Sequence, residues 1–249
     1  MVIRQLTPAA RGIEPMPHNR VSTILLIGAS RGLGHAMAVE FLKKGWNVVG
    51  TVRAGGGRTK LHDLAEEHKG RVEIETLDIC EPLQVAALRA RLAGREFDIL
   101  FVNAGVTNDK KETIADVTTE EFIRVMVTNS LSPMRVIETL QDLVSPTGLI
   151  GVMSSGLGSV SNNEIGGWEV YRGSKAALNM FMRSHAARHP GELRAMVLIA
   201  PGWVRTDMGG PDARLSIEES VPNLVHVLLA KQGKPGLEYL DYLGRAVSW

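Results

Sequence analysis

The sequence predicts an α/β fold: one doubly wound domain with a mostly parallel sheet of roughly seven strands. Three observations support this prediction. Short apolar runs of strand length alternate with longer segments of helical periodicity. A glycine-rich turn directly follows the first apolar run, which itself is apolar throughout, as expected of a strand covered on both faces. The chain has 249 residues and 44% hydrophobic content, which suits one large domain with a sizeable core.

The composition argues against several other classes of protein. A net charge of +1 gives no electrostatic reason to bind nucleic acid or an anionic membrane. Cys80 is the only cysteine, which rules out an internal disulfide and a cysteine-rich zinc site. No apolar stretch is long enough to span a bilayer.

The first twenty residues differ from the rest of the chain. They contain three prolines and no long apolar core, so they do not resemble a secretory signal. We expect residues 1–20 to be a flexible N-terminal extension and residues 21–249 to form the folded domain. The expected location is therefore the cytoplasm.

The first half of the chain predicts four strands with helices between them. The strands are short apolar or alternating runs at 21–27, 46–53, 71–77 and 97–102. The first helix follows the glycine turn and ends at 43–45, where two lysines and a glycine are typical of a helix C-terminus. Two further helices are expected at 60–68 and 82–92, the latter with proline near its start.

The second half predicts three more strands and three helices. The longest helical stretch, 118–144, begins with a capping box of Thr118 and Glu121 and contains Pro133, where we expect a kink. A second capping box, Ser216 with Glu219, begins a helix that reaches about residue 231. The remaining elements are a helix at 169–189 and strands at 148–153, 194–199 and 237–242.

The turn after the first strand has the spacing GxxxGxG, formed by Gly28, Gly32 and Gly34. In Rossmann-type folds this position holds a dinucleotide pyrophosphate on backbone N–H groups at a helix N-terminus. Glycine-rich loops also have purely structural uses, but the place of this one after the first strand favours a nucleotide.

The end of the second strand predicts which dinucleotide binds. An acidic residue there would bind the ribose hydroxyls and repel a 2′-phosphate, but this chain has Arg53. Guanidinium matches phosphate in charge and geometry, so NADP(H) is favoured, with Arg31 and Arg58 as further candidate cations. Asp78, after the third strand, either accepts a hydrogen bond from an adenine amino group or caps a turn.

Tyr171 and Lys175 lie four residues apart at the start of the predicted helix 169–189, so their side chains share one face. A free phenol has a pKa of about 10, and a nearby ammonium lowers that value. The pair is therefore a candidate acid–base centre, although an isolated YxxxK is more often a plain surface contact.

Several motifs in order resemble the short-chain dehydrogenase/reductase superfamily over residues 21–249. They are the glycine turn, Asp78, Asn103-Ala104-Gly105, Asn129, Ser155, Tyr171 with Lys175, and Pro201-Gly202. More narrowly, SSxxGS at 154–159, YRxSKAALNM at 171–180 and PGWVRTDMGG at 201–210 resemble the C-factor-like and sniffer-like carbonyl reductases.

The resemblance implies a role for each catalytic residue. Tyr171 would be the general acid or base, and Lys175 would lower its pKa and bind the nicotinamide ribose. Ser155, chosen over Ser154 because of the spacing to Gly158-Ser159, would polarise the substrate oxygen. Asn129 would bind a water molecule that links Lys175 to solvent, or would simply bond to neighbouring backbone.

The resemblance also implies a set of contacts with NADP(H). The expected residues are Gly28, Ser30, Arg31, Gly32, Leu33, Gly34, Arg53, Asp78, Ile79, Asn103, Ala104, Gly105, Tyr171, Lys175, Pro201, Gly202, Val204 and Thr206. No metal ligand is expected, since His185 and His189 are predicted to lie on a solvated basic face of their helix.

The expected function is hydride transfer between NADP(H) and a carbonyl or alcohol substrate, catalysed by a homodimer or homotetramer. The alternative is a dinucleotide-binding signalling or regulatory protein of the C-factor type that needs no turnover. Substrate choice is expected in the segment 156–168, because the sixteen-residue separation of Ser155 and Tyr171 is longer than in many members of the superfamily. Leu157, Trp168, Trp203 and Met208 are the candidate pocket residues, with a structural role in the core as the alternative.

Overall fold

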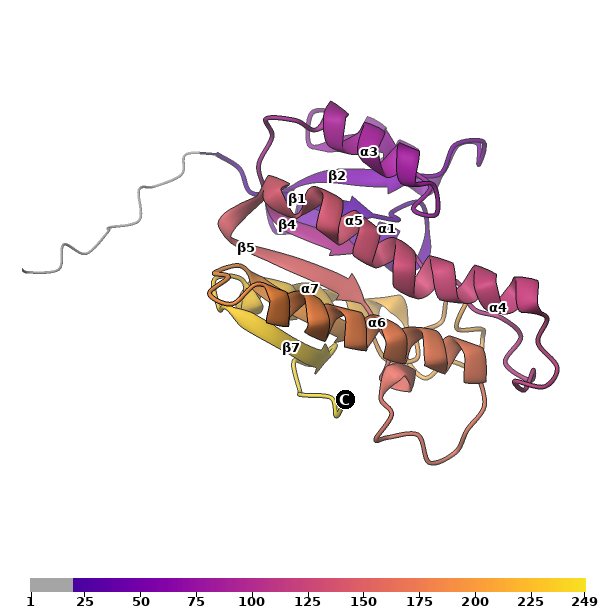
Figure 1. Cartoon of the computed structure of the whole chain (residues 1–249). Coiled ribbons are helices and arrows are strands. Elements are labelled where there is room, and N and C mark those ends of the chain that lie inside the picture. Colours follow the sequence, from indigo (N-terminus) through magenta and orange to yellow (C-terminus); the bar gives the residue numbers. More distant parts are fainter. Residues whose placement is uncertain (1–19) are drawn as a thin grey trace, which may run out of the picture.

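The computed structural model describes residues 20–249 (Figure 1). The expected N-terminal extension therefore lies outside the described residues, except for Arg20. The Arg20 guanidinium donates hydrogen bonds to the side chains of Glu96 and Asp98, where the fourth strand begins.

Seven strands form one sheet in which every neighbouring pair is parallel. They are β1 (Thr23–Ile27), β2 (Asn47–Val52), β3 (Val72–Thr76), β4 (Phe97–Val102), β5 (Val144–Met153), β6 (Ala195–Ala200) and β7 (Gly236–Asp241). Their order is β3-β2-β1-β4-β5-β6-β7. Because the order reverses between β1 and β4, a crevice is expected at their carboxyl ends, as in doubly wound sheets. The predicted fold class is confirmed.

Helices cover both faces of this sheet (Figure 1). One layer contains α1 (Gly32–Lys43), α2 (Lys60–Glu67) and α7 (Ile217–Lys231). The other contains α3 (Pro82–Arg91), α5 (Ser132–Leu140) and α6 (Glu169–Arg188), with α4 (Thr119–Met126) in contact with α6. The shorter helices, η1 (Val127–Leu131), η2 (Gln141–Leu143) and η3 (Gly156–Gly158), connect these elements.

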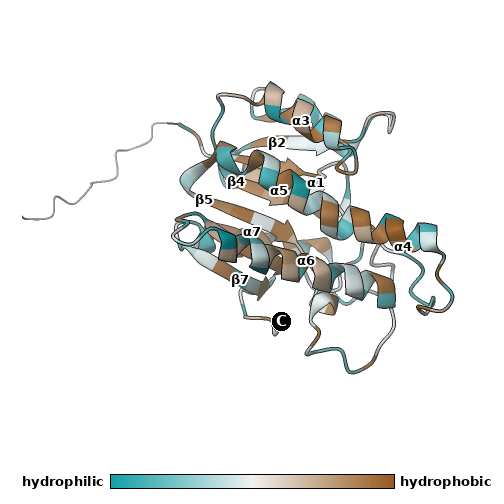
Figure 2. Ribbon diagram, viewed as in Figure 1, coloured by the Kyte–Doolittle hydropathy of each residue, from teal (hydrophilic) through white to brown (hydrophobic). Residues whose placement is uncertain are grey.

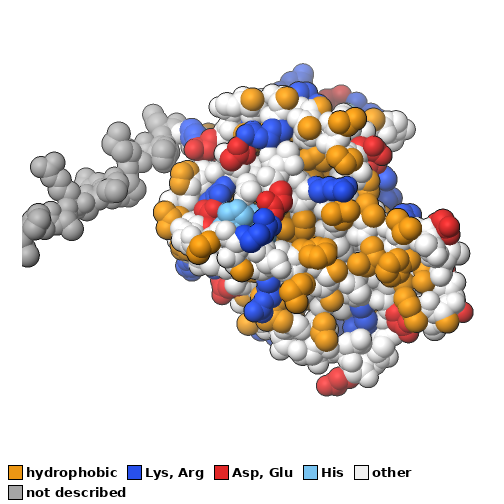
Figure 3. Space-filling model, in the orientation of Figure 1, with side chains coloured by type: hydrophobic (Ala, Val, Ile, Leu, Met, Phe, Trp, Pro, Cys, Tyr) orange, Lys and Arg blue, Asp and Glu red, His pale blue; other side chains and the backbone are white. Residues whose placement is uncertain are grey.

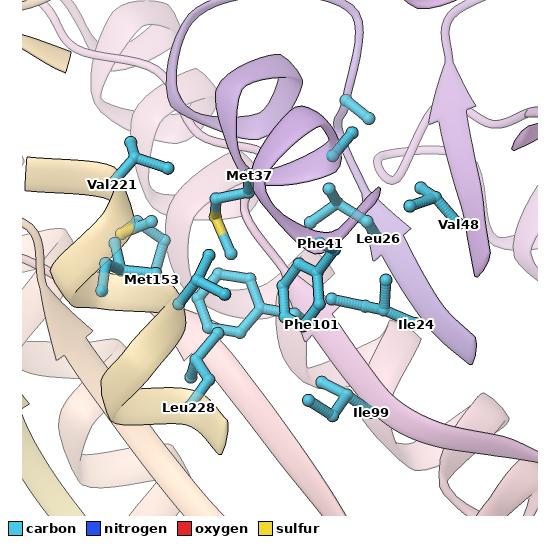
Figure 4. Close-up of a cluster of buried hydrophobic side chains, with 14 of the residues drawn as sticks. Ile24, Leu26, Met37, Phe41, Val48, Ile99, Phe101, Met153, Val221 and Leu228 are labelled. Carbon is cyan, nitrogen blue, oxygen red and sulfur yellow. The ribbon is translucent and has the colours of Figure 1, made fainter. Parts of the chain in front are cut away.

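The hydrophobic core is divided by the sheet into two clusters. Along β1, Ile24 and Leu26 belong to one cluster and Leu25 and Ile27 to the other, as the two-residue period of a strand requires. Figure 4 shows Phe41 of α1 beside Phe101 of β4 in the first cluster. The strands carry the most hydrophobic residues and lie between more polar helices (Figure 2), so burial of both sheet faces stabilises the domain.

The predicted kinked helix 118–144 is in fact four pieces, and this part of the prediction needs correction. After α4 comes the π-helical turn η1, then α5 and the 3-10 turn η2, and β5 already begins at Val144 instead of residue 148. Pro133 has no N–H, so an α-helical turn would leave the Asn129 carbonyl without its usual donor. The change in helix type directly before Pro133 has this physical cause.

The two predicted capping boxes differ in outcome. Ser216 and Glu219 form the complete box, with distances of 3.2 and 2.7 Å between the bonded atoms. Thr118 Oγ1 accepts the N–H of Glu121 at 3.1 Å, but the Glu121 carboxylate pairs with Arg124 instead of closing the box. An arginine one turn further along the helix therefore competes for the carboxylate.

The solvated face predicted for His185 and His189 is wrong for His185. This side chain is 1% exposed, and its Nδ1 lies 3.1 Å from Glu138 Oε1 on α5. The face of α6 that carries His185 packs against α5. The hydrophobic period of the sequence alone did not distinguish this buried face from a solvated one. No group of three metal-binding side chains occurs within residues 20–249. None of the helices in that range is both long and apolar enough to cross a membrane.

Candidate active site

A cavity of about 450 Å³ opens at the carboxyl edge of the sheet. Most of the residues expected to bind a dinucleotide line it: Gly28, Ser30, Arg31, Gly32, Leu33, Arg53, Asp78, Ile79, Asn103, Ala104, Gly105, Tyr171, Lys175, Pro201 and Thr206. These residues come from the loops after β1 to β4 and after β6, from the start of α1 and from the first two turns of α6. The cavity therefore occupies the crevice that the strand order predicts.

The glycine turn needs glycine for reasons of space. A Cβ on Gly34 would lie 2.0 Å from the Gly28 carbonyl oxygen and 2.6 Å from Asn103 Nδ2. Gly28 has φ +88° and leaves no room for a side chain beside Ala104. Two hydrogen bonds fix the turn, from Asn103 Nδ2 to the Gly28 carbonyl at 2.7 Å and from the Gly28 N–H to Thr51 Oγ1 at 2.9 Å.

Helix α1 begins at this turn without a side-chain cap. Its N-cap residue, Arg31, makes no capping hydrogen bond, and the first turn contains no acidic residue. By contrast, α7 has a complete capping box and two glutamates in its first turn. Free N–H groups and the positive end of the helix dipole make the start of α1 suitable for an anion such as a pyrophosphate.

The three candidate arginines have different surroundings. Arg58 donates hydrogen bonds to Asp63 and Glu66 and lies outside the cavity lining. Arg31 lines the cavity and pairs with Asp207 at 3.1 Å, but both side chains are more than 70% exposed, so this ion pair is weak. Arg53 lines the cavity and has no ion-pair partner within residues 20–249. It is the arginine best placed for a ligand phosphate.

Asp78 takes part in a turn, as one of its two interpretations predicts. Its Oδ1 accepts the N–H of Cys80 at 2.9 Å, and its own N–H donates to Gln84 Oε1. Asp78 also lines the cavity, so the contact with adenine stays a prediction.

Tyr171 and Lys175 lie on the first two turns of α6, beside the end of β5. Lys175 is 3% exposed, and its Nζ donates to the Met153 carbonyl at 2.9 Å. The same Nζ lies 5.9 Å from the centroid of the Tyr171 ring. The pair is therefore part of the cavity wall and is not the surface contact that an isolated YxxxK suggests.

The tandem serines have separate partners. Ser154 is buried, and its hydroxyl donates to Asn179 Oδ1 at 2.6 Å. The Ser155 hydroxyl accepts the N–H of Leu157 at 3.1 Å, and it lies near enough to the Tyr171 phenol to act on the pKa of that group. This geometry agrees with the choice of Ser155 as the partner of Tyr171.

Residues 22–214 match the family profile of the short chain dehydrogenases. The chain belongs to this family. A Burkholderia multivorans protein assigned to the short-chain dehydrogenases/reductases, with bound NADP, is 68% identical and superposes with a TM-score of 0.91, covering 92% of this chain and all of that chain. Carbonyl reductase Sniffer of D. melanogaster is 27% identical with a TM-score of 0.83, over 92% of this chain and all of that one.

The C-signal protein of Myxococcus xanthus is 36% identical over 154 residues, which are 61% of this chain and 92% of that protein. Together with the sniffer structure, it confirms the predicted resemblance to the C-factor-like and sniffer-like subgroup. This short-chain dehydrogenase is thus an oxidoreductase by family, in agreement with the predicted class.

The protonation of the Tyr171–Lys175 pair differs from the prediction. Burial raises the pKa of Tyr171 to about 12, and the nearby Ser155 hydroxyl only partly opposes this effect. Burial also lowers the pKa of Lys175 to about 8. The expected lowering of the phenol's pKa by the ammonium is wrong here, because Nζ points to the Met153 carbonyl and desolvation dominates.

Asn129 lies within the π-helical turn η1 and is fully buried. Its side-chain amide bonds to the N–H and the carbonyl of Val106, both at 2.8 Å, and to Ser174 Oγ at 3.0 Å. The structural role considered for Asn129 is therefore present, since these bonds join α6 to the chain after β4. Its role in binding a water molecule stays a prediction.

Five predicted site residues do not line the cavity itself. Ser155 and Asn129 each lie next to a lining residue, Ser154 and Thr128 respectively. The other three support the wall: Gly34 below the glycine turn, Gly202 against Leu215, and Val204 in a β-bridge with Leu215. Of the four candidate pocket residues, only Met208 lines the cavity, while the indole N–H of Trp203 is bonded to the Gly209 carbonyl.

Sequence reasoning missed several polar lining residues of this short-chain dehydrogenase. They include Thr51, Arg124, Thr128 and Asp207. Arg124 and Thr128 lie four apart and therefore share one helix face with each other. The spacing of Arg124 and Thr128 could have indicated that they belong to one surface. No comparable signal exists for Thr51 and Asp207, which the tertiary fold brings to the cavity.

We predict that Lys175→Met increases stability at neutral pH while removing a group of the site. The Lys175 pKa is about 8 in the folded protein and 10.5 as a free side chain, so the unfolded chain binds more protons between these values. Burial of the charged Lys175 therefore lowers the free energy of unfolding by its full amount below pH 8. This loss of stability disappears as the pH approaches 10.5. We expect the free energy of unfolding at pH 7 to rise by roughly 1–3 kcal/mol.

The measurement is urea denaturation between pH 7 and pH 10. The increase in the free energy of unfolding caused by Lys175→Met should become smaller as the pH rises through this range. The control is Lys69→Met at an exposed position, which should show no such trend. A gain that is independent of pH would contradict the burial argument.

Proposed function

We propose that this protein is an NADPH-dependent reductase of aldehydes or ketones. The observation that carries the proposal is one arrangement: the Tyr171 phenol, near the Ser155 hydroxyl and next to the buried Lys175, lines a cavity that begins at the glycine turn. Similarity to a Burkholderia multivorans protein with bound NADP and to carbonyl reductase Sniffer supports both the cofactor and the substrate class.

The residues fit a dinucleotide with a 2′-phosphate. The uncapped start of α1 would bind the pyrophosphate through backbone N–H groups, and Arg53 would bind the 2′-phosphate at the end of β2. Gly28 and Gly34 keep the turn free of side chains, so the backbone can approach a ligand closely. When bound, NADPH supplies the hydride.

Tyr171 would act as the general acid. Its phenol O–H breaks as the new alcohol O–H forms, so the carbonyl oxygen gains the proton that Tyr171 loses. The Ser155 hydroxyl would donate a hydrogen bond to the same oxygen and stabilise the negative charge that develops there. Lys175, held by the Met153 carbonyl, would stabilise the resulting phenolate until it regains a proton from solvent.

The pKa values favour the direction of carbonyl reduction near neutral pH. With a pKa of about 12, the phenol is protonated and ready to donate. Oxidation of an alcohol would need the phenolate and should become faster as the pH rises. The alternative, a dinucleotide-binding regulatory protein, has less support, because binding alone requires no cavity-lining phenol beside a buried amine.

Tyr171→Phe tests the proposed chemistry. Loss of the phenol removes the proton donor but keeps the ring, so turnover with NADPH and a panel of aldehydes and ketones should fall about 1000-fold. NADPH affinity, measured by fluorescence titration, should stay within about twofold because Lys175 and the glycine turn remain. Wild-type turnover in this variant would refute the mechanism.

Arg53→Asp tests the choice of cofactor. Removing a charged hydrogen bond to the 2′-phosphate and adding a repulsive carboxylate should lower the NADPH-to-NADH ratio of kcat/KM by about 10- to 100-fold. Arg58→Asp is the matched control, since it makes the same charge change outside the cavity lining. Equal effects of the two changes would show that Arg53 has no special contact with the phosphate.

We also propose that the chain forms a homodimer or homotetramer through α4 and α6. Phe122 and Ile123 on α4 and Met180 and Phe181 on α6 are exposed large apolar side chains, and apolar side chains gather on this face of the molecule (Figure 3).

Phe181→Lys should convert the assembly to a monomer in light scattering, because a charge would be buried at the contact. Leu83→Lys, at an 84% exposed position on α3, should leave the mass unchanged. A wild-type protein that is already monomeric at micromolar concentration would refute the assembly.

A further inference from the structure

The segment 156–168 connects Ser155 to the helix that carries Tyr171, yet little of it is buried. Val160 is 72% exposed and Ile165 86% exposed. Such a segment gains little from hydrophobic packing, so hydrogen bonds must define its conformation. Its last part is fixed by Arg172, whose guanidinium donates to the carbonyls of Gly166 and Gly167 at 3.0 and 2.8 Å. The contacts of its first part come from β7 and the end of the sequence.

Tyr239 on β7 contacts the main chain at Ser155. The Tyr239 ring is 3% exposed, and its hydroxyl donates to the Ser155 carbonyl oxygen. The same hydroxyl is also close to the side chains of Ser154 and Asn179. Asn179 in turn donates to the Gly158 carbonyl at 3.1 Å. A buried polar cluster therefore holds the chain both at Ser155 and three residues later.

Trp249 contacts the next part of the segment. Its main-chain oxygen accepts the N–H groups of Val160 and Ser161 at 2.9 and 3.2 Å, and the hydroxyls of Ser159 and Ser161 at 3.3 Å. Figure 1 shows this end of the chain beside the loop that follows β5. Trp249 thus binds the segment at residues 159–161, between Ser155 and Tyr171.

The Trp249 ring connects this contact to Tyr239. The two ring centroids are 5.5 Å apart, and the guanidinium of Arg183 lies 4.7 Å from the centroid of the indole ring. Val247 donates its N–H to the Tyr239 carbonyl at 2.8 Å, and Ala246 bridges to Leu240, so the chain after β7 turns back along that strand. The position of Trp249 is therefore defined by β7 and α6.

We propose that Tyr239 and Trp249 are positioning residues that hold Ser155 and residues 156–161 against the catalytic face of α6. Neither side chain lines the cavity, so both act through Ser155 and the segment. The hydroxyl of Ser155 must stay within hydrogen-bond distance of Tyr171 and of the substrate oxygen, and a small displacement lowers turnover strongly. This inference rests on the proposed reductase function.

The test compares Tyr239→Phe, Trp249→Ala and Trp249→Phe with the control Tyr242→Phe, which makes the same change on the opposite hydrophobic cluster. The assay uses NADPH and the aldehyde that the wild type reduces fastest. Tyr239→Phe and Trp249→Ala should each lower kcat by about 5- to 20-fold with NADPH affinity within about twofold of wild type. Trp249→Phe should restore at least half of the activity, and Tyr242→Phe should keep all of it.

Hydrogen exchange separates positioning from general stability. In Trp249→Ala, the amides of Val160 and Ser161 should exchange faster while those of β4 and β5 keep their protection. Wild-type kcat in both Tyr239→Phe and Trp249→Ala would overturn the inference. So would a parallel loss of kcat, NADPH affinity and core protection, because that pattern indicates unfolding.

Tyr171→Phe in the same assay distinguishes the two possible failures. If Tyr171→Phe is inactive while Tyr239→Phe and Trp249→Ala behave as wild type, only the positioning role is wrong. If Tyr171→Phe is as active as the wild type, the proposed function itself fails.

Discussion

The hydrogen bond from Lys175 Nζ to the Met153 carbonyl holds the start of α6 at the carboxyl end of β5, at 2.9 Å. Lys175 is almost completely buried, so its ammonium needs this acceptor. β5 lies between β4 and β6 inside the sheet, which makes this edge one of the most constrained parts of the fold. Tyr171 precedes Lys175 by about one turn of the same helix, so its position depends on the same bond.

Burial has opposite effects on the two groups that share this site. It raises the pKa of the Tyr171 phenol and lowers that of the Lys175 ammonium, because each neutral form is easier to remove from water. The environment that reduces stability around Lys175 is thus the one that keeps the phenol protonated at neutral pH. In the proposed mechanism this site combines a destabilising group with a proton donor, a common compromise in catalytic centres.

The fold was largely predictable because hydrophobic period and turn residues are local signals. All seven strands lie where expected, with ends within two residues, except that β5 begins four residues early. The π-helical turn η1 was not predictable in detail, since it depends on Pro133 and on the docking of Asn129 against Ser174. Many of the lining residues followed from motifs, but Thr51, Arg124, Thr128 and Asp207 did not. The difference between Arg53 and Arg58 could not be predicted from motifs, because it depends on which carboxylates the tertiary fold brings near each guanidinium.

The pKa of Tyr171 and the surroundings of His185 were both mispredicted for one reason: spacing along a helix tells which side chains are neighbours but not how deeply they are buried. The same limit applies to the segment 156–168, whose contacts with Trp249 join residues about ninety positions apart. The Tyr171–Lys175 pair depends on β5 and α6, and the exposed segment depends on hydrogen bonds from Arg172 and Asn179 of α6 as well as from the end of the sequence. The two regions therefore share α6 as a support, because this helix carries Tyr171 and Lys175 as well as Arg172 and Asn179.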